Sequence, residues 1–541
     1  MLIENAEQNM GVDNGRNPAE SEAVSRVLAV AVSYHLKGAR EEALKVLEGL
    51  DTNIRPEDAA EILAARGHVQ FELGRYQDAL SSYKDLAGIR PKDATVQFNL
   101  GLSLQNLARY AEALESFRKS LTLGAKPLEP QLAIGTCLLH LNRHAEALEA
   151  FDAALDLAPE SEAALFGKAA ALQTGWDFDE AATIYQKILE RNPKAEDSLV
   201  NMISLSMQRK DYDQVQRYAE RLLEIRPDAL AALEGLAAAA FAREDYTAAA
   251  QYSAQLTEIA PNVYDHWFNL GVARYKSGQV RESIEAYRRA SEIRPEAIYA
   301  HINLAVAHEE LGELPQARAA YQRTSQIAPD RADLQFHLAW TVERSGSVQE
   351  AEALYEKLVA SNPDSENAWF RLGYLKLSRN DYRGAAQAFE NCLKKKPEWP
   401  EAQINLGLAY ARLDDYDRAE STLERLLQQQ PQSIDALRGL AAIALKRPNH
   451  EKALEYHQRL LEAGEMTPEV LYNSGLLSQQ LEKLDDAAGF YRSALEVQPA
   501  FAEAMLNLGH VLEVLGRKDE ARDYWVSALQ AKPELARGYF H

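Results

Sequence analysis

The sequence predicts an all-α solenoid of tandem helical hairpins, and three regularities carry this prediction. Proline recurs with a period of 34 residues, apolar residues recur at helical spacings on both sides of a glycine turn, and small residues occupy two fixed positions of each repeat. A fixed period of this length is typical of arrays in which every hairpin buries its apolar face against its neighbours. The prolines of the period are Pro91, Pro159, Pro193, Pro227, Pro261, Pro295, Pro329, Pro363, Pro397, Pro431, Pro499 and Pro533.

One repeat, residues 264–297, illustrates the pattern, with its positions numbered 1 to 34 from Tyr264. Apolar residues at three- and four-residue spacings flank Gly278 and predict two amphipathic helices joined by a turn. Pro295 closes the second helix. The residues that define the pattern are Trp267, Leu270, Gly271, Tyr275, Gly278, Ser283, Tyr287, Ala290 and Pro295, at positions 4, 7, 8, 12, 15, 20, 24, 27 and 32.

Small residues mark the points where the two helices of a repeat should cross closely. Position 8 is Gly or Ala in fourteen consecutive repeats with the exception of Ile203, and position 20 is Ala in all but Val215 and Ser283. A large side chain at either position would separate the helices. Position 24 is usually aromatic, which predicts a ring between the second helix and the next repeat; Ala219, Ser253, Leu423 and His457 break this series. The two consecutive breaks predict a softer stretch around residues 196–263.

The repeats can be placed in order along the chain. Gly38–Ala43 matches Gly74–Ala79 with an offset of 36 instead of 34, so the first of fifteen repeats is slightly long. We expect a disordered lead over residues 1–18, a continuous solenoid over 19–535, and the start of a further or capping helix over 536–541. The repeats begin near residues 24, 60, 94, 128, 162, 196, 230, 264, 298, 332, 366, 400, 434, 468 and 502.

The composition of the chain restricts the classes of function that we expect for this protein. The chain of 541 residues carries a net charge of −22, so a nucleic-acid partner is disfavoured and a neutral or basic partner is favoured. Two cysteines cannot build a disulfide framework. The sequence has neither the pattern of a signal peptide nor an apolar run that could span a bilayer, and it predicts a cytoplasmic protein without membrane insertion.

The sequence contains no recognisable catalytic constellation. His140 and His144 have the spacing of a metal-binding pair but lack the accompanying glutamate, and no glycine-rich phosphate-binding motif occurs. We therefore expect a protein that is not an enzyme and that needs no cofactor or metal.

The pattern of Gly, Ala, aromatic residues and Pro resembles the tetratricopeptide repeat, and the resemblance covers residues 24–535. It implies a right-handed superhelix of about fifteen hairpins, in which the first helix of each hairpin lines a concave groove. In such proteins positions 2, 5, 6, 9, 12 and 13 of the repeat usually face the groove.

Position 6 is asparagine in seven repeats: Asn99, Asn201, Asn269, Asn303, Asn405, Asn473 and Asn507. An amide both donates and accepts hydrogen bonds, so it matches the backbone of an extended peptide whatever the peptide's sequence. This series is similar to the asparagine ladder of the repeat arm of O-linked N-acetylglucosamine transferase, which holds protein substrates. The alternative is that these amides serve only local helix solvation.

Apolar and aromatic residues add to this surface. Position 5 is mostly apolar, and part of that stripe must pack within the repeat. The further peptide-binding candidates are Phe268, Phe336 and Phe370 at position 5, Arg371 at position 6, Trp340 and Tyr374 at position 9, and Tyr275 at position 12.

Position 2 is acidic in many repeats, which argues against a clamp for the acidic C-termini of chaperones and favours neutral or basic segments. The alternative is that these acids only favour the start of the helix.

Three functional hypotheses follow. The leading one is a non-enzymatic scaffold that binds extended polypeptide in its groove. The second is the substrate-recruiting arm of a protein glycosyltransferase or similar enzyme whose catalytic domain is absent from this chain. The third is self-assembly through uncapped ends of the solenoid.

Overall fold

The computed structural model describes residues 18–50 and 55–538, and within these ranges it contains thirty α-helices, one short 3₁₀ helix and no strand. The predicted all-α repeat class is therefore confirmed. The expected N-terminal lead lies outside the described residues, apart from Pro18, where α1 begins. The chain divides into two compact units, one ending at Ala273 and the other beginning at Arg274, so that the division falls inside α15 (Tyr264–Lys276).

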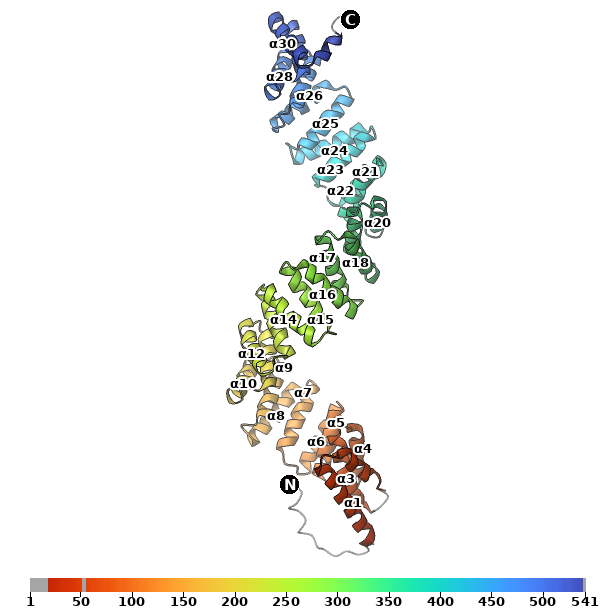
Figure 1. Cartoon of the computed structure of the whole chain (residues 1–541), viewed down its shortest axis with the longest axis vertical. Coiled ribbons are helices and arrows are strands. Elements are labelled where there is room, and N and C mark those ends of the chain that lie inside the picture. Colours follow the sequence, from red (N-terminus) through yellow and green to blue (C-terminus); the bar gives the residue numbers. More distant parts are fainter. Residues whose placement is uncertain (1–17, 51–54, 539–541) are drawn as a thin grey trace. The chain divides into compact units, whose positions relative to one another are not determined.

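The helices of the first unit form consecutive hairpins (Figure 1). They are α1 (Pro18–Leu36), α2 (Arg40–Glu48), α3 (Pro56–Glu72), α4 (Tyr76–Ile89), α5 (Ala94–Asn106), α6 (Tyr110–Thr122), α7 (Leu128–His140), α8 (His144–Leu157), α9 (Glu162–Thr174), α10 (Phe178–Arg191), α11 (Glu196–Gln208), α12 (Tyr212–Ile225), α13 (Leu230–Ala242) and α14 (Tyr246–Ile259).

The second unit continues the same arrangement and ends in the 3₁₀ helix Pro533–Gly538. Its helices are α16 (Val280–Ile293), α17 (Ile298–Glu310), α18 (Leu314–Ile327), α19 (Ala332–Arg344), α20 (Val348–Ser361), α21 (Glu366–Ser378), α22 (Tyr382–Lys395), α23 (Pro400–Arg412), α24 (Tyr416–Gln429), α25 (Ile434–Lys446), α26 (His450–Glu462), α27 (Pro468–Gln480), α28 (Leu484–Val497), α29 (Ala502–Val514) and α30 (Lys518–Ala531).

Within each unit, consecutive hairpins pack against one another, and several pairs of first helices from neighbouring hairpins also touch. In the first unit α7 contacts α9 and α11 contacts α13, and in the second unit α23 contacts α25. Direct contact between successive first helices is what a curved array requires on its inner side. Within each unit, the odd-numbered helices therefore form the crowded surface on which a groove can lie.

The turn inside each hairpin needs one residue with a positive φ angle. Gly278 (φ 82°) and Gly346 (φ 84°) supply it without steric cost, as the glycine-turn pattern predicts. Other repeats place a non-glycine residue there, such as Asn142 (φ 57°) or Asp414 (φ 57°). The hairpin geometry is thus kept even where the glycine signal is missing from the sequence, because packing of the two helices outweighs the local preference of the turn residue.

The aromatic side chain at position 24 explains why position 8 is small. A Cβ atom added to Gly101 would lie 2.6 Å from the ring of Phe117, and one added to Gly475 would lie 2.6 Å from the ring of Tyr491. The same ring also fills space against the following repeat, since a Cβ atom on Gly167 would lie 2.2 Å from Phe151. One buried ring therefore joins three helices.

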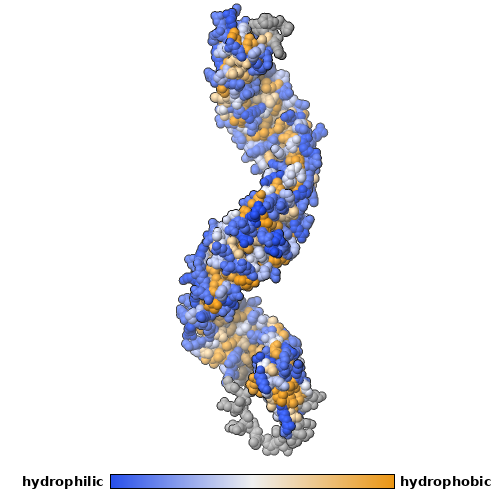
Figure 2. Space-filling view, in the orientation of Figure 1, coloured by the Kyte–Doolittle hydropathy of each residue, from blue (hydrophilic) through white to orange (hydrophobic). Residues whose placement is uncertain are grey.

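The surface of the molecule is largely hydrophilic on the face shown in Figure 2, with hydrophobic residues interspersed. Among the described helices, none combines the length and the apolar character that crossing a membrane would require.

Two glycines of one repeat provide a test of this packing. Gly475→Ala should destabilise its repeat by about 1–3 kcal/mol, because the added methyl group meets the Tyr491 ring. Gly489→Ala, on the exposed side of α28 where a Cβ meets nothing within 4 Å, should stabilise by about 0.5–1 kcal/mol. Denaturant unfolding of both variants checks this. Equal effects of the two substitutions would contradict the packing of the ring against position 8.

Candidate functional site

The fourteen candidate residues all lie on odd-numbered helices. Asn99 is on α5 and Asn201 on α11, while Phe268, Asn269 and Tyr275 are on α15. The second unit places Asn303 on α17, Phe336 and Trp340 on α19, Phe370, Arg371 and Tyr374 on α21, Asn405 on α23, Asn473 on α27 and Asn507 on α29.

Three of the asparagines hydrogen-bond to tyrosines of the preceding repeat. The Asn201 amide donates to the Tyr185 hydroxyl (3.1 Å). Burial raises the pKa of Tyr287, and a hydrogen bond with Asn303 opposes this shift. The Asn507 amide donates to the Tyr472 hydroxyl (2.9 Å). These amides therefore serve as hydrogen-bond partners for phenol groups at the junction between repeats. A phenol group buried there without a partner would lower the stability of the fold.

The sequence itself contains a pattern for this pairing, at a spacing of 16 residues. Every tyrosine at position 24 is followed by a polar residue at position 6 of the next repeat. The pairs are Tyr83 and Asn99, Tyr185 and Asn201, Tyr287 and Asn303, Tyr321 and His337, Tyr355 and Arg371, and Tyr491 and Asn507. Residues without a hydroxyl group are often followed by a small residue instead, as in Phe117 and Ala133, Phe151 and Gly167, Ala219 and Gly235, and Leu423 and Gly439. The 16-residue spacing from a tyrosine at position 24 to a polar residue at position 6 is therefore a sequence signal of internal pairing, which position 6 alone does not give.

Among the described residues, the other four asparagines of position 6 have no hydrogen bond to a tyrosine. The Asn405 amide donates to the carbonyl oxygen of Glu401 in its own helix (2.8 Å). In the described part of the chain, no hydrogen-bond partner is found for the side chains of Asn99, Asn269 and Asn473, and Asn269 is the exposed one of the three. Asn269 is therefore the asparagine best placed to bind something outside the protein.

Asn269 lies at a groove in the first unit, formed by α11, α13 and α15, with a volume of about 970 Å³. We call it the α11–α15 groove. It lies where Ala219 and Ser253 replace the usual aromatic residue of position 24, and Ser253 lines it. At the Ala219 junction, Ile203 and Val215 occupy space that a ring takes in other repeats, since a Cβ atom on Gly235 would lie 2.8 Å from Ile203 and 3.1 Å from Val215. Its apolar lining includes Val200, Ile203, Met207, Tyr212, Phe241, Leu256, Phe268 and Val272.

The polar groups of the groove are few. Among its lining residues, Glu234 and Asp265 carry charge and neither lysine nor arginine occurs. His266 is buried, and its Nε2 lies 3.1 Å from a carboxylate oxygen of Glu234. Within the described residues, the buried Ser253 hydroxyl and Nδ1 of His266 have no hydrogen-bond partner. The groove thus combines an apolar floor with negative charge, while the unpaired atoms of Ser253 and His266 are buried.

A second hollow, of about 570 Å³, lies between α23 and α25 in the second unit. Its lining includes Leu423, which replaces a ring at position 24, and Gly439 at position 6 of the next repeat. Leu423 packs against Gly439 in place of a ring, since a Cβ atom on Gly439 would lie 2.7 Å from Leu423, and the hollow lies beside this contact.

The predicted aromatic residues around Arg371 do come together in the second unit. The Arg371 guanidinium lies 4.6 Å from the centre of the Trp340 ring and 5.1 Å from that of Tyr374. It is also ion-paired with Glu343, which in turn accepts a hydrogen bond from the Tyr355 hydroxyl (3.0 Å). Because its charge is already matched within the protein, Arg371 is poorly suited to bind the carboxylate of a ligand, whereas Tyr374, 46% exposed, offers an accessible ring.

The three phenylalanines of position 5 take part in internal packing. Phe336 lies against Tyr355 (ring centres 5.9 Å apart), and Phe370 stacks on Trp399 (4.5 Å). Phe268 stacks on Tyr264 (5.6 Å), which leaves Phe268 half-buried at the edge of the α11–α15 groove.

Tyr275, at position 12, hydrogen-bonds to Glu310, and this bond together with burial raises its pKa to about 12.

Comparison with known families agrees with this architecture, which is that of a helical-repeat scaffold. Tetratricopeptide repeat models match residues 55–130, 131–196, 203–264 and 472–536, with further repeat models over 271–312 and 312–373. The model of the tetratricopeptide repeat domain of the cytochrome c-type biogenesis protein H matches residues 351–468. The chain belongs to the tetratricopeptide repeat proteins. Its repeats support a general role as a protein–protein interaction scaffold.

Solved structures with similar repeats include MamA, with 24% identity over 31% of this chain and 97% of MamA (TM-score 0.28). The Cut9–Hcn1 complex of the APC/C matches with 14% identity over 88% of this chain and 94% of the other (TM-score 0.33). The C-terminal part of a tetratricopeptide repeat protein from Cytophaga hutchinsonii matches with 16% identity over 44% and 99% (TM-score 0.39). No curated protein matches this sequence.

The two kinds of asparagine can be told apart by stability. Asn201→Ala should cost about 1–3 kcal/mol, because the Tyr185 hydroxyl loses its donor while remaining buried. Asn269→Ala, at the same position of a repeat but exposed and unbonded, should leave stability unchanged or slightly raised. Thermal and denaturant unfolding of the two variants tests this.

A double variant provides the control. Tyr185→Phe combined with Asn201→Ala should recover most of the lost stability, because both polar groups are then removed together. If the double variant is as unstable as Asn201→Ala alone, the pairing of amide and phenol is not the cause.

Proposed function

We propose that this protein is a scaffold that binds extended polypeptide segments in the α11–α15 groove, and that neutral to basic segments are preferred. The single observation that carries the proposal is a groove whose apolar floor, exposed Asn269 amide and acidic residues lie together on the odd-numbered helices of the first unit.

The size and lining of the groove support a peptide as the ligand. Ligand pockets typically occupy about 300–1,000 Å³ and combine apolar walls with a few polar groups. The groove of about 970 Å³ has this composition. An extended peptide offers one amide donor and one carbonyl acceptor per residue, which match the exposed Asn269 side chain.

The charges of the groove support the preference for neutral or basic peptides. Glu234 and Asp265 line it without a lysine or arginine among the lining residues, so an acidic peptide would meet like charges. The chain's net charge of −22 acts in the same direction over longer distances.

The expected affinity is moderate. Each net hydrogen bond contributes about 0.5–1.5 kcal/mol, so a few amide contacts alone would give only weak binding. Burial of apolar side chains against Phe241, Phe268 and Val272 must supply the rest, at about 25 cal/mol per Å². We therefore expect dissociation constants around micromolar and broad sequence tolerance.

Binding to a panel of synthetic peptides, graded in apolar content and net charge, tests the proposal by fluorescence anisotropy. Apolar peptides with lysine or arginine should bind, and acidic ones should not. Asn269→Ala should weaken the best peptide by about 0.5–1.5 kcal/mol, or roughly 2- to 13-fold. Asp265→Lys should weaken basic peptides further and relax the exclusion of acidic ones.

Glu258→Lys is the matched control, because it makes the same change in charge at an exposed residue of α14, a second helix of its hairpin. It should leave binding nearly unchanged at physiological salt. Binding that responds equally to Asp265→Lys and Glu258→Lys would point to overall charge instead of the groove, and binding of no peptide in the panel would overturn the proposal.

A further inference from the structure

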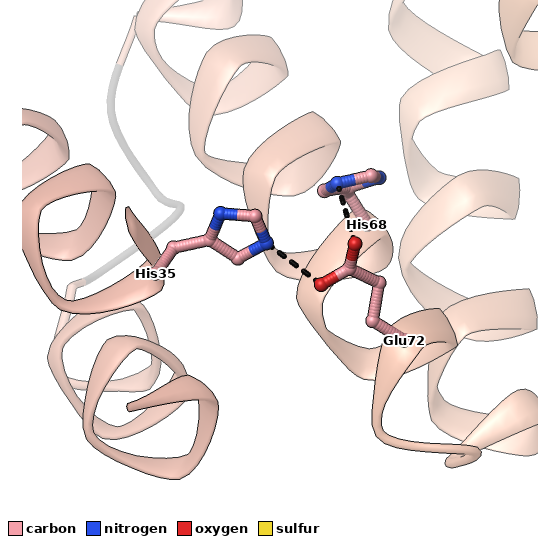
Figure 3. A group of neighbouring side chains, drawn as sticks. All are labelled: His35, His68 and Glu72. Carbon is pink, nitrogen blue, oxygen red and sulfur yellow. Dashed lines mark hydrogen bonds and ion pairs between the residues drawn. The ribbon is translucent and has the colours of Figure 1, made fainter. Parts of the chain in front are cut away.

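Three side chains with metal-binding atoms converge at the start of the first unit (Figure 3). His35, from α1, places its Nε2 atom 2.7 Å from a carboxylate oxygen of Glu72, and the Nε2 atom of His68 lies 3.5 Å from the other oxygen. The ligand atoms of the three residues all lie within 4.8 Å of one another. Neither the repeat pattern nor the proposed peptide groove accounts for this group.

The fold builds the group from two hairpins. His68 and Glu72 are four residues apart on α3, so they share one face of that helix. His35 comes from near the end of α1 in the preceding hairpin, and α1 packs against α3. The side chains of His35 and Glu72 are 29% and 28% exposed and that of His68 is 59% exposed, so an ion in solution can reach all three.

We propose that His35, His68 and Glu72 form a binding site for a divalent transition metal ion with the coordination chemistry of Zn²⁺. Two imidazole nitrogens and one carboxylate oxygen are a ligand set that Zn²⁺ uses, and ions such as Mg²⁺, which prefer oxygen ligands, do not favour it. Three protein ligands leave a position of a tetrahedral ion open to water or to a group from another molecule.

Arg40 sets the strength of the site. Its Nε donates to the same Glu72 oxygen that faces His35 (2.8 Å). Hydrogen bonds from Arg40 and His35 hold the pKa of Glu72 below its usual value, so this carboxylate is ionised over the neutral range. Arg40 therefore competes with a metal ion for one oxygen of Glu72 and, as a cation, repels the ion.

A bound ion would join the first hairpin to the second. The first hairpin is now linked to the second by packing, by the hydrogen bonds of His35 and Arg40 to Glu72, and by others such as those from Arg66 to the Leu47 and Leu50 carbonyl oxygens. Because metal binding to the folded state alone stabilises that state, the ion should protect the first hairpin against local unfolding.

Calorimetric titration of the metal-free full chain with Zn²⁺ tests the inference. One site per chain is expected, together with a rise in melting temperature and slower hydrogen exchange in α1 and α3. His68→Ala and Glu72→Gln should each weaken binding at least tenfold. His140→Ala, which removes a histidine that stacks on Tyr110 elsewhere in the unit, should leave the titration unchanged.

Two further arms separate the site from nonspecific histidine binding. Arg40→Gln should tighten Zn²⁺ binding several-fold, since it removes the competing cation, and Mg²⁺ should produce neither heat nor stabilisation. Substitution with Co²⁺ should give the visible absorption of a tetrahedral nitrogen- and oxygen-ligated ion, and this should be lost in His35→Ala. Zn²⁺ binding that is absent, or that is as strong in His68→Ala as in the unmodified chain, would overturn the inference.

Discussion

In most repeats, the burial of one aromatic ring between the two helices of its own hairpin and the first helix of the next is the contact on which the architecture depends. The ring needs small residues facing it, which is why glycine or alanine occupies position 8, as with Gly101 beneath Phe117. A single side chain thereby fixes both the spacing within a hairpin and the packing between hairpins. Stability in such an array is mainly a sum over nearest neighbours, so each ring acts locally.

This constraint also decides where polar residues are needed and where space remains. A tyrosine in the ring position carries its hydroxyl into the junction between repeats, where a polar residue 16 positions later can bond to it, as Asn201 does to Tyr185. Other hydroxyls donate to a residue 12 positions earlier, as Tyr321, Tyr355 and Tyr491 do to Glu309, Glu343 and Gln479. Where Ala219 and Ser253 replace the ring, side chains such as Ile203 and Val215 pack instead, and the α11–α15 groove lies alongside. The departure from the repeat pattern thus coincides with a surface that can accept a ligand.

The charged residues near the candidate sites are paired differently in the two units. The α11–α15 groove keeps Glu234 and Asp265 without a lysine or arginine among its lining residues, whereas in the second unit the Arg371 charge is matched by Glu343 and covered by Trp340. Residues of similar appearance in the sequence therefore differ in what they can offer a partner. A charge that is already ion-paired within the protein contributes little to binding a partner. An acidic side chain without a basic neighbour can attract a basic partner.

The sequence by itself determined the all-α class, the hairpin order and the odd-numbered helices as the candidate surface, because the 34-residue period and the small residues at fixed positions record local helix packing. Only the tertiary structure decided which candidates are available. Asn201 and Asn269 occupy equivalent positions, yet one satisfies a buried phenol and the other is exposed. The convergence of His35 with His68 and Glu72 likewise depends on how two hairpins pack. These distinctions arise from contacts between repeats, which the residue type at a single position does not record.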